Sequence, residues 1–318
     1  MESVRNITMT VKTFRALLTA ALALISIGAF ITPVSASETG ENGQAAAYIK
    51  MGVGARPLGM GGAFSAIADD ATAAYWNPAG LVQLKSDEIT TMHAVLNMDR
   101  QLNFVNYAKK LEDGSFWAFS WTRFGIDKIE ERAGQNDPRG YAAGDLIGYF
   151  NDDENTYAGT YSWKIKPDVS CGVTLKYMDQ SVADASARSF GMDLGLLYRI
   201  NDQFSMATTL KDLSSDLRWD TGANHSDNIP WSARIGMVFK PRESLLLALD
   251  VDKTEDLDAQ LHFGMEGWIQ EMFGIRAGVD DGDLSLGSTI RLEQWQIDYS
   301  FTDRNFGDQH RISGKYSF

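Results

Sequence analysis

The residues that could do chemistry in this chain are few, and their spacing does not assemble a catalytic group. The 318-residue sequence holds one cysteine, Cys171, and four histidines, His93, His225, His262 and His310. No serine lies in a nucleophile elbow, and no cluster of histidine, cysteine and carboxylate residues has the spacing of a metal site. His262 alternates with the apolar Leu261 and Phe263, so its imidazole points to the opposite face of a strand. We therefore expect no catalytic residue, no cofactor and no metal, and predict that the protein is not an enzyme.

A glycine-rich stretch and two acidic stretches could instead bind a phosphate or a cation. The glycines of residues 52–64 are interrupted by Pro57, and no strand leads into them, which disfavours a nucleotide-binding loop. Residues 151–154 and 280–283 are rich in carboxylates, but neither has the spacing of a dedicated calcium loop. Solvated turns are the simpler interpretation of both acidic stretches.

The N-terminus has the pattern of a secretory signal peptide. Arg5, Lys12 and Arg15 precede an apolar run over residues 16–31, and a small-residue cleavage site follows that ends at Ala36. Removal of residues 1–36 takes away three cations and one acid, which changes the net charge from −13 to −15. An exported chain of that charge is not expected to bind a nucleic-acid backbone.

The elements that must position any site are predicted to be strands. From Glu88 onward the chain divides into fourteen runs of about nine to eleven residues, the length that a tilted strand needs to cross a bilayer. Apolar and polar residues alternate in most of them, as in Phe190, Met192 and Leu194 against their neighbours. The runs start near Glu88, Arg100, Ser115, Thr156, Asp168, Arg188, Gln203, Trp231, Ser244, Asp258, Met272, Asp283, Gln294 and Gln309. Residues 85–318 are therefore predicted to form an all-β, closed antiparallel transmembrane β-barrel of about 14 strands.

The connections between these runs support a barrel over a soluble β-sandwich. Short turns alternate with longer loops, of which residues 124–155 and 212–230 are the longest. Outer-membrane barrels have short periplasmic turns and long external loops, whereas a sandwich has no reason to keep that alternation. We expect both termini to be periplasmic and the barrel to contact outer-membrane lipid.

The segment before the first strand is the least strand-like part of the predicted mature chain. Its glycines permit close packing and positive φ angles, and residues 69–76 could form a short helix that ends before Pro78. Asp69 and Asp70 are interpreted as the start of this helix rather than as a metal pair. Residues 37–84 are predicted to be a linker followed by a plug in the barrel lumen.

This segment resembles the N-terminal signature of the PorV/PorQ branch of the FadL-like outer-membrane barrels. The resemblance covers about thirty residues and consists of a Gly-Ala-Arg and Gly-Met-Gly-Gly-Ala block, followed by an Ala-Asp-Asp-Ala and Tyr-Trp-Asn-Pro-Ala-Gly-Leu block. The plug-motif residues are Gly54, Ala55, Arg56, Gly59, Met60, Gly61, Gly62, Asp69, Asp70, Trp76, Asn77, Pro78 and Gly80.

The resemblance implies a protein of the bacterial outer membrane with one of two functions. Membership of the PorV/PorQ branch implies a non-enzymatic role in type IX protein secretion, as a subunit that shuttles cargo or attaches it to the surface. The wider FadL-like relationship implies a passive uptake channel for fatty acids or other hydrophobic compounds. The closeness of the signature favours export, so the expected partners are secretion-system proteins or secreted cargo. In the uptake alternative the partner is a hydrophobic small molecule.

Three further groups of residues are candidates for a role. The last nine residues alternate in polarity, and Tyr316 with Phe318 is predicted to be the signal that the barrel-assembly machinery recognises.

In the loop over residues 124–155, Leu146, Ile147, Tyr149 and Phe150 could contact a solute or a partner, or fold over the barrel mouth as a lid. Charges of both signs are expected to face the lumen, where they would form cross-strand ion pairs or line a polar path: Lys176, Asp193, Arg199, Lys211, Arg234, Asp250, Glu266, Arg276, Asp280, Arg291 and Asp298.

Overall fold

The computed structural model describes residues 44–97, 99–135, 137–221, 225–304 and 307–318. The predicted signal peptide, residues 1–36, and the first part of the predicted linker lie outside the described residues.

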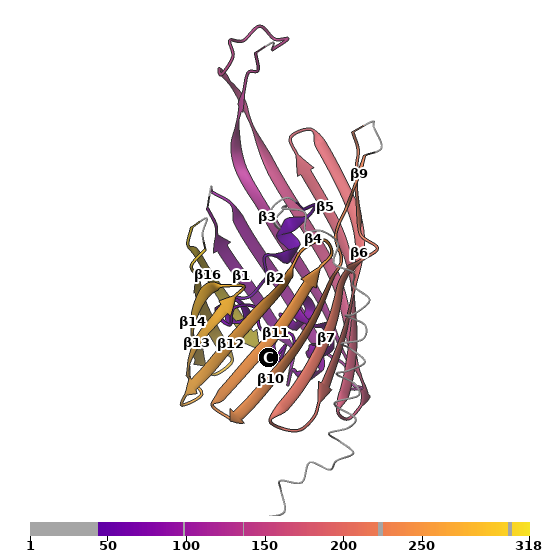
Figure 1. The fold of residues 1–318 in the computed structure, drawn as a ribbon, viewed down its shortest axis with the longest axis vertical. Coiled ribbons are helices and arrows are strands. Elements are labelled where there is room, and N and C mark those ends of the chain that lie inside the picture. The colour runs from indigo at the N-terminus through magenta and orange to yellow at the C-terminus, as the bar shows by residue number, and fades with distance from the viewer. Residues whose placement is uncertain (1–43, 98, 136, 222–224, 305–306) are drawn as a thin grey trace, which may run out of the picture. The chain divides into compact units, whose positions relative to one another are not determined.

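Fourteen long strands form one closed antiparallel barrel (Figure 1). Each long strand pairs with its neighbours in sequence, and the first and last strands pair with each other from Glu88↔Ser317 to Val95↔His310. Closure satisfies the backbone groups that an open edge would leave unpaired in lipid. The predicted fold class and strand number are confirmed. The strands are β1 Glu88–Val95, β2 Gln101–Lys110, β3 Phe116–Arg132, β4 Leu146–Lys166, β5 Val169–Val182, β6 Ala185–Arg199, β7 Phe204–Leu213, β10 Ser232–Arg242, β11 Leu245–Thr254, β12 Ala259–Ile269, β13 Phe273–Asp280, β14 Asp283–Leu292, β15 Trp295–Thr302 and β16 Gln309–Ser317.

The outer and inner faces of the barrel have opposite polarity. On β6 the outward Phe190 is 71% exposed, whereas the inward Ser189 and Asp193 are buried. An apolar surface of this extent is favourable only when lipid covers it, because water would be ordered around every exposed ring and methyl group. Among the described residues no helix is both long enough and apolar enough to cross a membrane.

The strands on one side of the barrel extend beyond the rim, which corrects two loop predictions. In place of a loop over residues 124–155, β3 continues to Arg132 and β4 begins at Leu146, and the two form a ribbon that projects from the barrel (Figure 1). Cross-strand pairs such as Ile129↔Phe150 continue the ladder past a bulge. The second predicted loop contains a short hairpin, β8 Asp216–Trp219 with β9 Ser226–Asn228. Charged residues interrupt the apolar alternation in both places without interrupting the hydrogen bonds.

A plug of short helices fills part of the lumen (Figure 1). It consists of η2 Ala47–Lys50, α2 Ala55–Gly59, α3 Ala73–Trp76 and η3 Pro78–Gln83. Helix α3 is shorter than the predicted helix over residues 69–76, because residues 70–72 form a bend and a turn. The largest fully buried side chains include Phe64, Met60, Ile67 and Leu81 of the plug, so the core of the protein lies between the plug and the wall.

Candidate functional site

The plug is seated in notches that glycines leave in the wall. A side-chain carbon at Gly278 of β13 would lie 2.2 Å from the carbonyl carbon of Met60, and one at Gly264 of β12 would lie 2.5 Å from its carbonyl oxygen. Across the lumen, a side-chain carbon at Gly172 of β5 would lie 2.4 Å from the carbonyl carbon of Pro78. Any larger residue at these positions would push the plug backbone away, so the wall is shaped to hold it.

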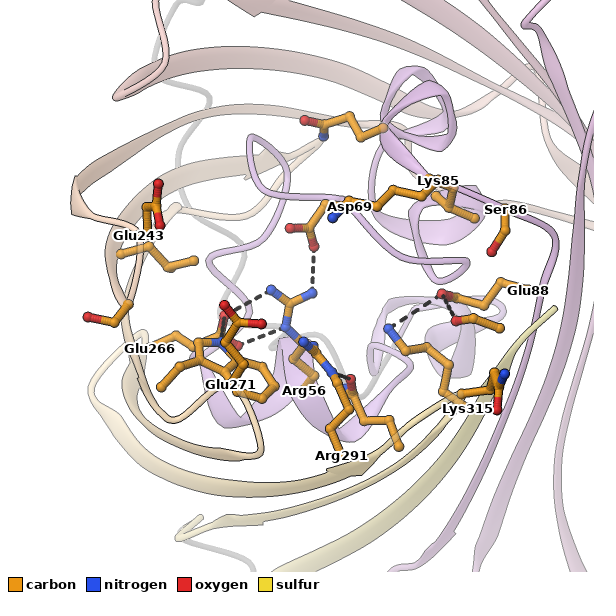
Figure 2. A pocket seen from close by; sticks show the side chains of 18 of the residues that line it. Arg56, Asp69, Lys85, Ser86, Glu88, Glu243, Glu266, Glu271, Arg291 and Lys315 are labelled. Carbon is orange, nitrogen blue, oxygen red and sulfur yellow. Dashed lines mark hydrogen bonds and ion pairs between the residues drawn. The ribbon is translucent and has the colours of Figure 1, made fainter.

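Arg56 of α2 is the centre of an ion-pair network that joins the plug to the wall (Figure 2). Its guanidinium donates from Nε and Nη2 to the two carboxylate oxygens of Glu266 on β12, at 2.8 and 2.9 Å. The same guanidinium donates from Nη1 to Asp69 at 2.5 Å and to Asp70 at 3.1 Å. Glu266 also accepts from Arg276 on β13 at 2.5 Å. A bidentate, buried arrangement of this kind fixes the position of α2 against β12.

The Asp69 carboxyl titrates below its ordinary range. Burial by itself would raise its pKa, but the positive charge of Arg56 outweighs burial and lowers the pKa of Asp69. Burial opposes the charge of Arg56, but the carboxylates of Asp69, Glu266 and Asp70 outweigh it and raise the pKa of Arg56. Arg56 and Asp69 therefore both stay ionised at neutral pH. Asp70 has a second role, because it accepts from the backbone N–H of Thr72 at 3.0 Å in the turn that leads into α3.

Wall side chains from β10 and β11 hold the plug backbone directly. Asp250 accepts from the N–H groups of Phe64 and Ser65, at 3.2 and 3.0 Å. Arg234 donates to the carbonyl of Gly62 at 2.8 Å, and it also pairs with Asp252 at 3.1 Å. Polar groups of the plug that would otherwise be buried without a partner are thereby satisfied.

The second motif block forms the other half of the plug. The Trp76 indole donates to the carbonyl of Val53 at 2.8 Å, which ties α3 to the segment before α2. The Asn77 side chain donates to the carbonyl of Ser65 at 2.9 Å and accepts from the N–H of Ala79 at 3.1 Å, with Pro78 at the first position of η3. A side-chain carbon at Gly80 would lie 2.3 Å from the carbonyl oxygen of Ala68. The residues of the two motif blocks therefore build and seat the plug.

Several of the other predicted lumen charges form ion pairs, whereas Arg291 donates to Gln296 at 3.0 Å and lies over the Trp268 ring. Lys176 pairs with Asp193 at 2.7 Å and also with Asp212, and Arg276 pairs with Asp298 at 3.3 Å. Arg199 is exposed at the end of β6. Cross-strand ion pairs of this kind brace the wall, as one of the two interpretations of the sequence holds.

Two cavities lie at opposite ends of the plug. The cavity at the short-turn end has a volume of ≈ 920 Å³ and is lined by charged residues that include Arg56, Glu88, Arg291 and Lys315 (Figure 2). The cavity at the other end has a volume of ≈ 500 Å³, and Trp76 and Lys211 are among its lining residues. The Lys211 ammonium lies 3.9 Å from the centre of the Tyr75 ring, a cation–π contact. The plug therefore separates two spaces within one barrel.

The predicted acidic sites and contact residues fall in different surroundings. Residues 151–154 belong to β4, and residues 280–283 form the tight turn between β13 and β14. Among the described residues no group of three or more histidines, cysteines and carboxylates could hold a metal ion. Leu146, Ile147, Tyr149 and Phe150 lie on the projecting ribbon instead of in a loop.

The C-terminal aromatic residues lie at the short-turn end of the barrel. The backbone N–H of Phe318 donates to the carbonyl of Asp87 at 3.0 Å. The Phe318 ring makes edge contacts with Tyr107 and Tyr316, with centroids 6.2 and 5.0 Å apart. The last strand is thereby joined to the start of β1 where the barrel closes.

For several residues of the site the sequence does not identify the contact that the structure shows. Glu88 accepts from the N–H of Ala71 at 2.6 Å, and the carbonyl of Gly61 lies 3.1 Å from Nδ1 of His262. Tyr48 of η2 reaches Thr156 of β4. Inward alternation places Glu88 and His262 in the lumen, but it does not identify the plug residue that each one meets.

Taken together, the fold and the site define a class of protein, a β-barrel whose lumen holds an N-terminal plug. Residues 23–189 match the model of the Uncharacterised protein family (UPF0164). The match covers more than half of the chain, and the chain therefore belongs to this family. Among curated proteins, none matches the chain.

Several solved structures share this fold. The Ralstonia pickettii toluene transporter TbuX has a TM-score of 0.60 and 10% identity, over 84% of this chain and 98% of that one. The Pseudomonas putida toluene transporter TodX has a TM-score of 0.57 and 12% identity, over 83% of this chain and 96% of that one. A Pseudomonas aeruginosa FadL homologue has a TM-score of 0.55 and 12% identity, over 80% of this chain and 96% of that one. At such low identity the similarity establishes the fold, so the FadL-like resemblance is confirmed at that level, and the PorV/PorQ resemblance stays a prediction.

Proposed function

We propose that this protein is an outer-membrane channel for the passive uptake of hydrophobic compounds. The observation that carries the proposal is the plug, which lies in the lumen of a barrel with an apolar exterior and separates a cavity of ≈ 500 Å³ from one of ≈ 920 Å³. A barrel with only a structural role has no need of two cavities with a plug between them. In this proposal the plug is the gate of the channel.

The named structural neighbours support uptake more strongly than export. Two of them are toluene transporters and one is a FadL homologue, and each is matched over nearly its whole length. The signature in the N-terminal segment favours the export role, but its residues prove to be those that build and seat the plug. A plug of this kind serves a channel as well as it serves an export subunit.

The test is the entry of toluene into cells. Cells that produce the full chain should take up radiolabelled toluene faster than matched cells with an empty vector, at equal barrel content in the outer membrane. Equal rates in the two strains would contradict the proposal. An unrelated outer-membrane barrel produced at the same level controls for general leakage.

A role in type IX protein secretion is the second candidate, and the projecting ribbon is the observation that favours it. Leu146 is 46% exposed and Tyr149 is 60% exposed on a pair of strands that extends past the rim. Exposed apolar residues on such a ribbon suit a protein contact. Leu146→Asp with Tyr149→Asp should abolish co-purification of a secreted cargo in this case and leave toluene uptake unchanged.

A further inference from the structure

The inner face of the barrel wall contacts a phenol group of the plug, the side chain of Tyr48. Tyr48 of η2 is 3% exposed, and its ring stacks on Phe124 of β3 with centroids 6.1 Å apart and planes 20° apart. Its hydroxyl lies 2.6 Å from the Thr156 hydroxyl of β4. Burial raises the pKa of the Tyr48 phenol, so the group remains neutral. The wall thus provides one surface for an aromatic ring and one hydroxyl partner for a phenol.

The helix that carries Tyr48 is attached differently from the rest of the plug. Residues 54–81 are held by wall glycines, by the Arg56 network and by Asp250, as described above. Helix η2 is joined to that seated part through Gly52 and Gly54, which have φ angles of 79° and 85°. Two hydrogen bonds also hold η2, from the Tyr75 hydroxyl to the carbonyl of Ile49 at 2.7 Å and from the Lys50 ammonium to the carbonyl of Pro230 at 3.1 Å. Its N-cap, Ala46, also has a left-handed φ of 53°, which a residue with a side chain rarely adopts. A displacement of η2 that leaves α2 in place would turn about these glycines and break the hydrogen bonds of Ile49 and Lys50.

Space for a solute begins beside the Tyr48 contact. A void of ≈ 30 Å³ is lined by Ile49 of η2 together with Phe104 and Thr156 of the wall. Its other lining residues are mostly small or carry a hydroxyl, and three are charged: Ala74, Tyr75, Ser120, Thr122, Ala158, Thr174, Lys176, Asp193 and Lys211. Ile49, Tyr75 and Lys211 also line the cavity of ≈ 500 Å³. Displacement of η2 would therefore join this cavity to the Tyr48 contact.

We propose that Tyr48 occupies a solute-binding site of the wall, and that the solute is a small aromatic compound with one hydroxyl group, such as a phenol. The inference rests on the proposed uptake function and names its substrate class. The solute replaces the Tyr48 ring on Phe124 and the Tyr48 hydroxyl at Thr156, while η2 swings away. Toluene can replace the ring only, which leaves the buried Thr156 hydroxyl without its partner.

Binding of p-cresol, which is the free side chain of tyrosine, tests this site. Isothermal titration of the purified full chain in detergent should show weak binding, because most molecules have Tyr48 in the site. Tyr48→Ala should bind p-cresol at least about tenfold more tightly than the wild type, and its affinity for toluene should rise less. Adding Thr156→Val to Tyr48→Ala should abolish the preference for p-cresol over toluene. No gain in Tyr48→Ala, or equal gains for both compounds, would overturn the proposal.

A neighbouring tyrosine supplies the matched control. Tyr157 faces outward and packs against Tyr177, so Tyr157→Ala should bind p-cresol as the wild type does. Heat-modifiable migration in gels reports whether each variant folds. If Tyr48→Ala does not fold, Tyr48→Phe keeps the ring and loses only the hydroxyl, and it should show a smaller gain for p-cresol. An unchanged affinity in Tyr48→Phe would then count against the site.

The outcomes distinguish failure of this site from failure of the proposed channel. If p-cresol binds as expected but cells take up neither compound, the channel function is wrong and the site stands. If toluene uptake is observed but no Tyr48 variant gains affinity for p-cresol, the channel stands and the site is wrong.

Discussion

Substitution of Arg56 by methionine should release the plug from the wall. The change keeps most of the side-chain volume but removes a guanidinium whose bonds to Glu266 are 2.8 and 2.9 Å long, and it leaves Asp69 and Asp70 without that cation. Breaking a buried ion pair from one side costs about 3–5 kcal/mol. Asp69 is 29% exposed and Glu266 keeps Arg276, so the lower part of that range applies. A loss of about 3 kcal/mol corresponds to a roughly 10²-fold rise in the fraction of molecules with an undocked plug.

Two measurements check this expectation for Arg56→Met. In planar bilayers the variant should open far more often than the wild type, and trypsin should cleave its plug faster while the barrel stays intact. Arg188→Met is the control, because Arg188 forms an exposed pair with Asp179 at 3.2 Å and does not contact the plug. Currents and cleavage rates equal to those of the wild type would refute the role of Arg56 in holding the plug against the wall.

Three other perturbations have defined outcomes. Gly278→Ala places a side-chain carbon 2.2 Å from the Met60 backbone and should destabilise plug docking by about 1–3 kcal/mol in the same two assays, whereas Gly314→Ala, with 3.6 Å to its nearest neighbour, should be silent. Phe318→Asp should lower the yield of heat-modifiable barrel in the outer membrane without changing the channel properties of the molecules that assemble; a normal yield would contradict this. Because the pKa of Asp69 is lowered, its carboxylate stabilises docking fully above the ordinary value of about 3.9 and loses this effect as pH falls through the lower value in the folded protein. Bilayer currents should therefore be constant from pH 7 to pH 5 and rise only below the ordinary carboxyl pKa of about 3.9, and a rise already between pH 7 and pH 5 would show that another group controls docking.

The alternation of side chains along the sequence determines the barrel almost completely. In a strand the side-chain period is two, so residues such as Phe190 and Asp193 are assigned to opposite faces without any knowledge of the partner strand. The number of strands follows from the same pattern, and closure follows because lipid tolerates no open edge. The pattern fails where charges replace apolar residues above the rim, and there the predicted loop over residues 124–155 proved to be the paired ends of β3 and β4.

The plug and its contacts depend on the tertiary structure. The sequence marks residues 52–81 as a compact, glycine-rich segment, yet the partner of Arg56 lies 210 residues away on β12, and the segment's own acids were equally available to it. The role of the wall glycines is even harder to predict from the sequence. Gly172 and Gly278 are simply small residues in a strand until the structure places Pro78 and Met60 against them. The contact of Tyr48 with Thr156 spans 108 residues and requires that β3 and β4 be adjacent and that η2 bend toward them. Local periodicity specifies which face a side chain takes, whereas the closing of the barrel alone decides which distant residue it meets.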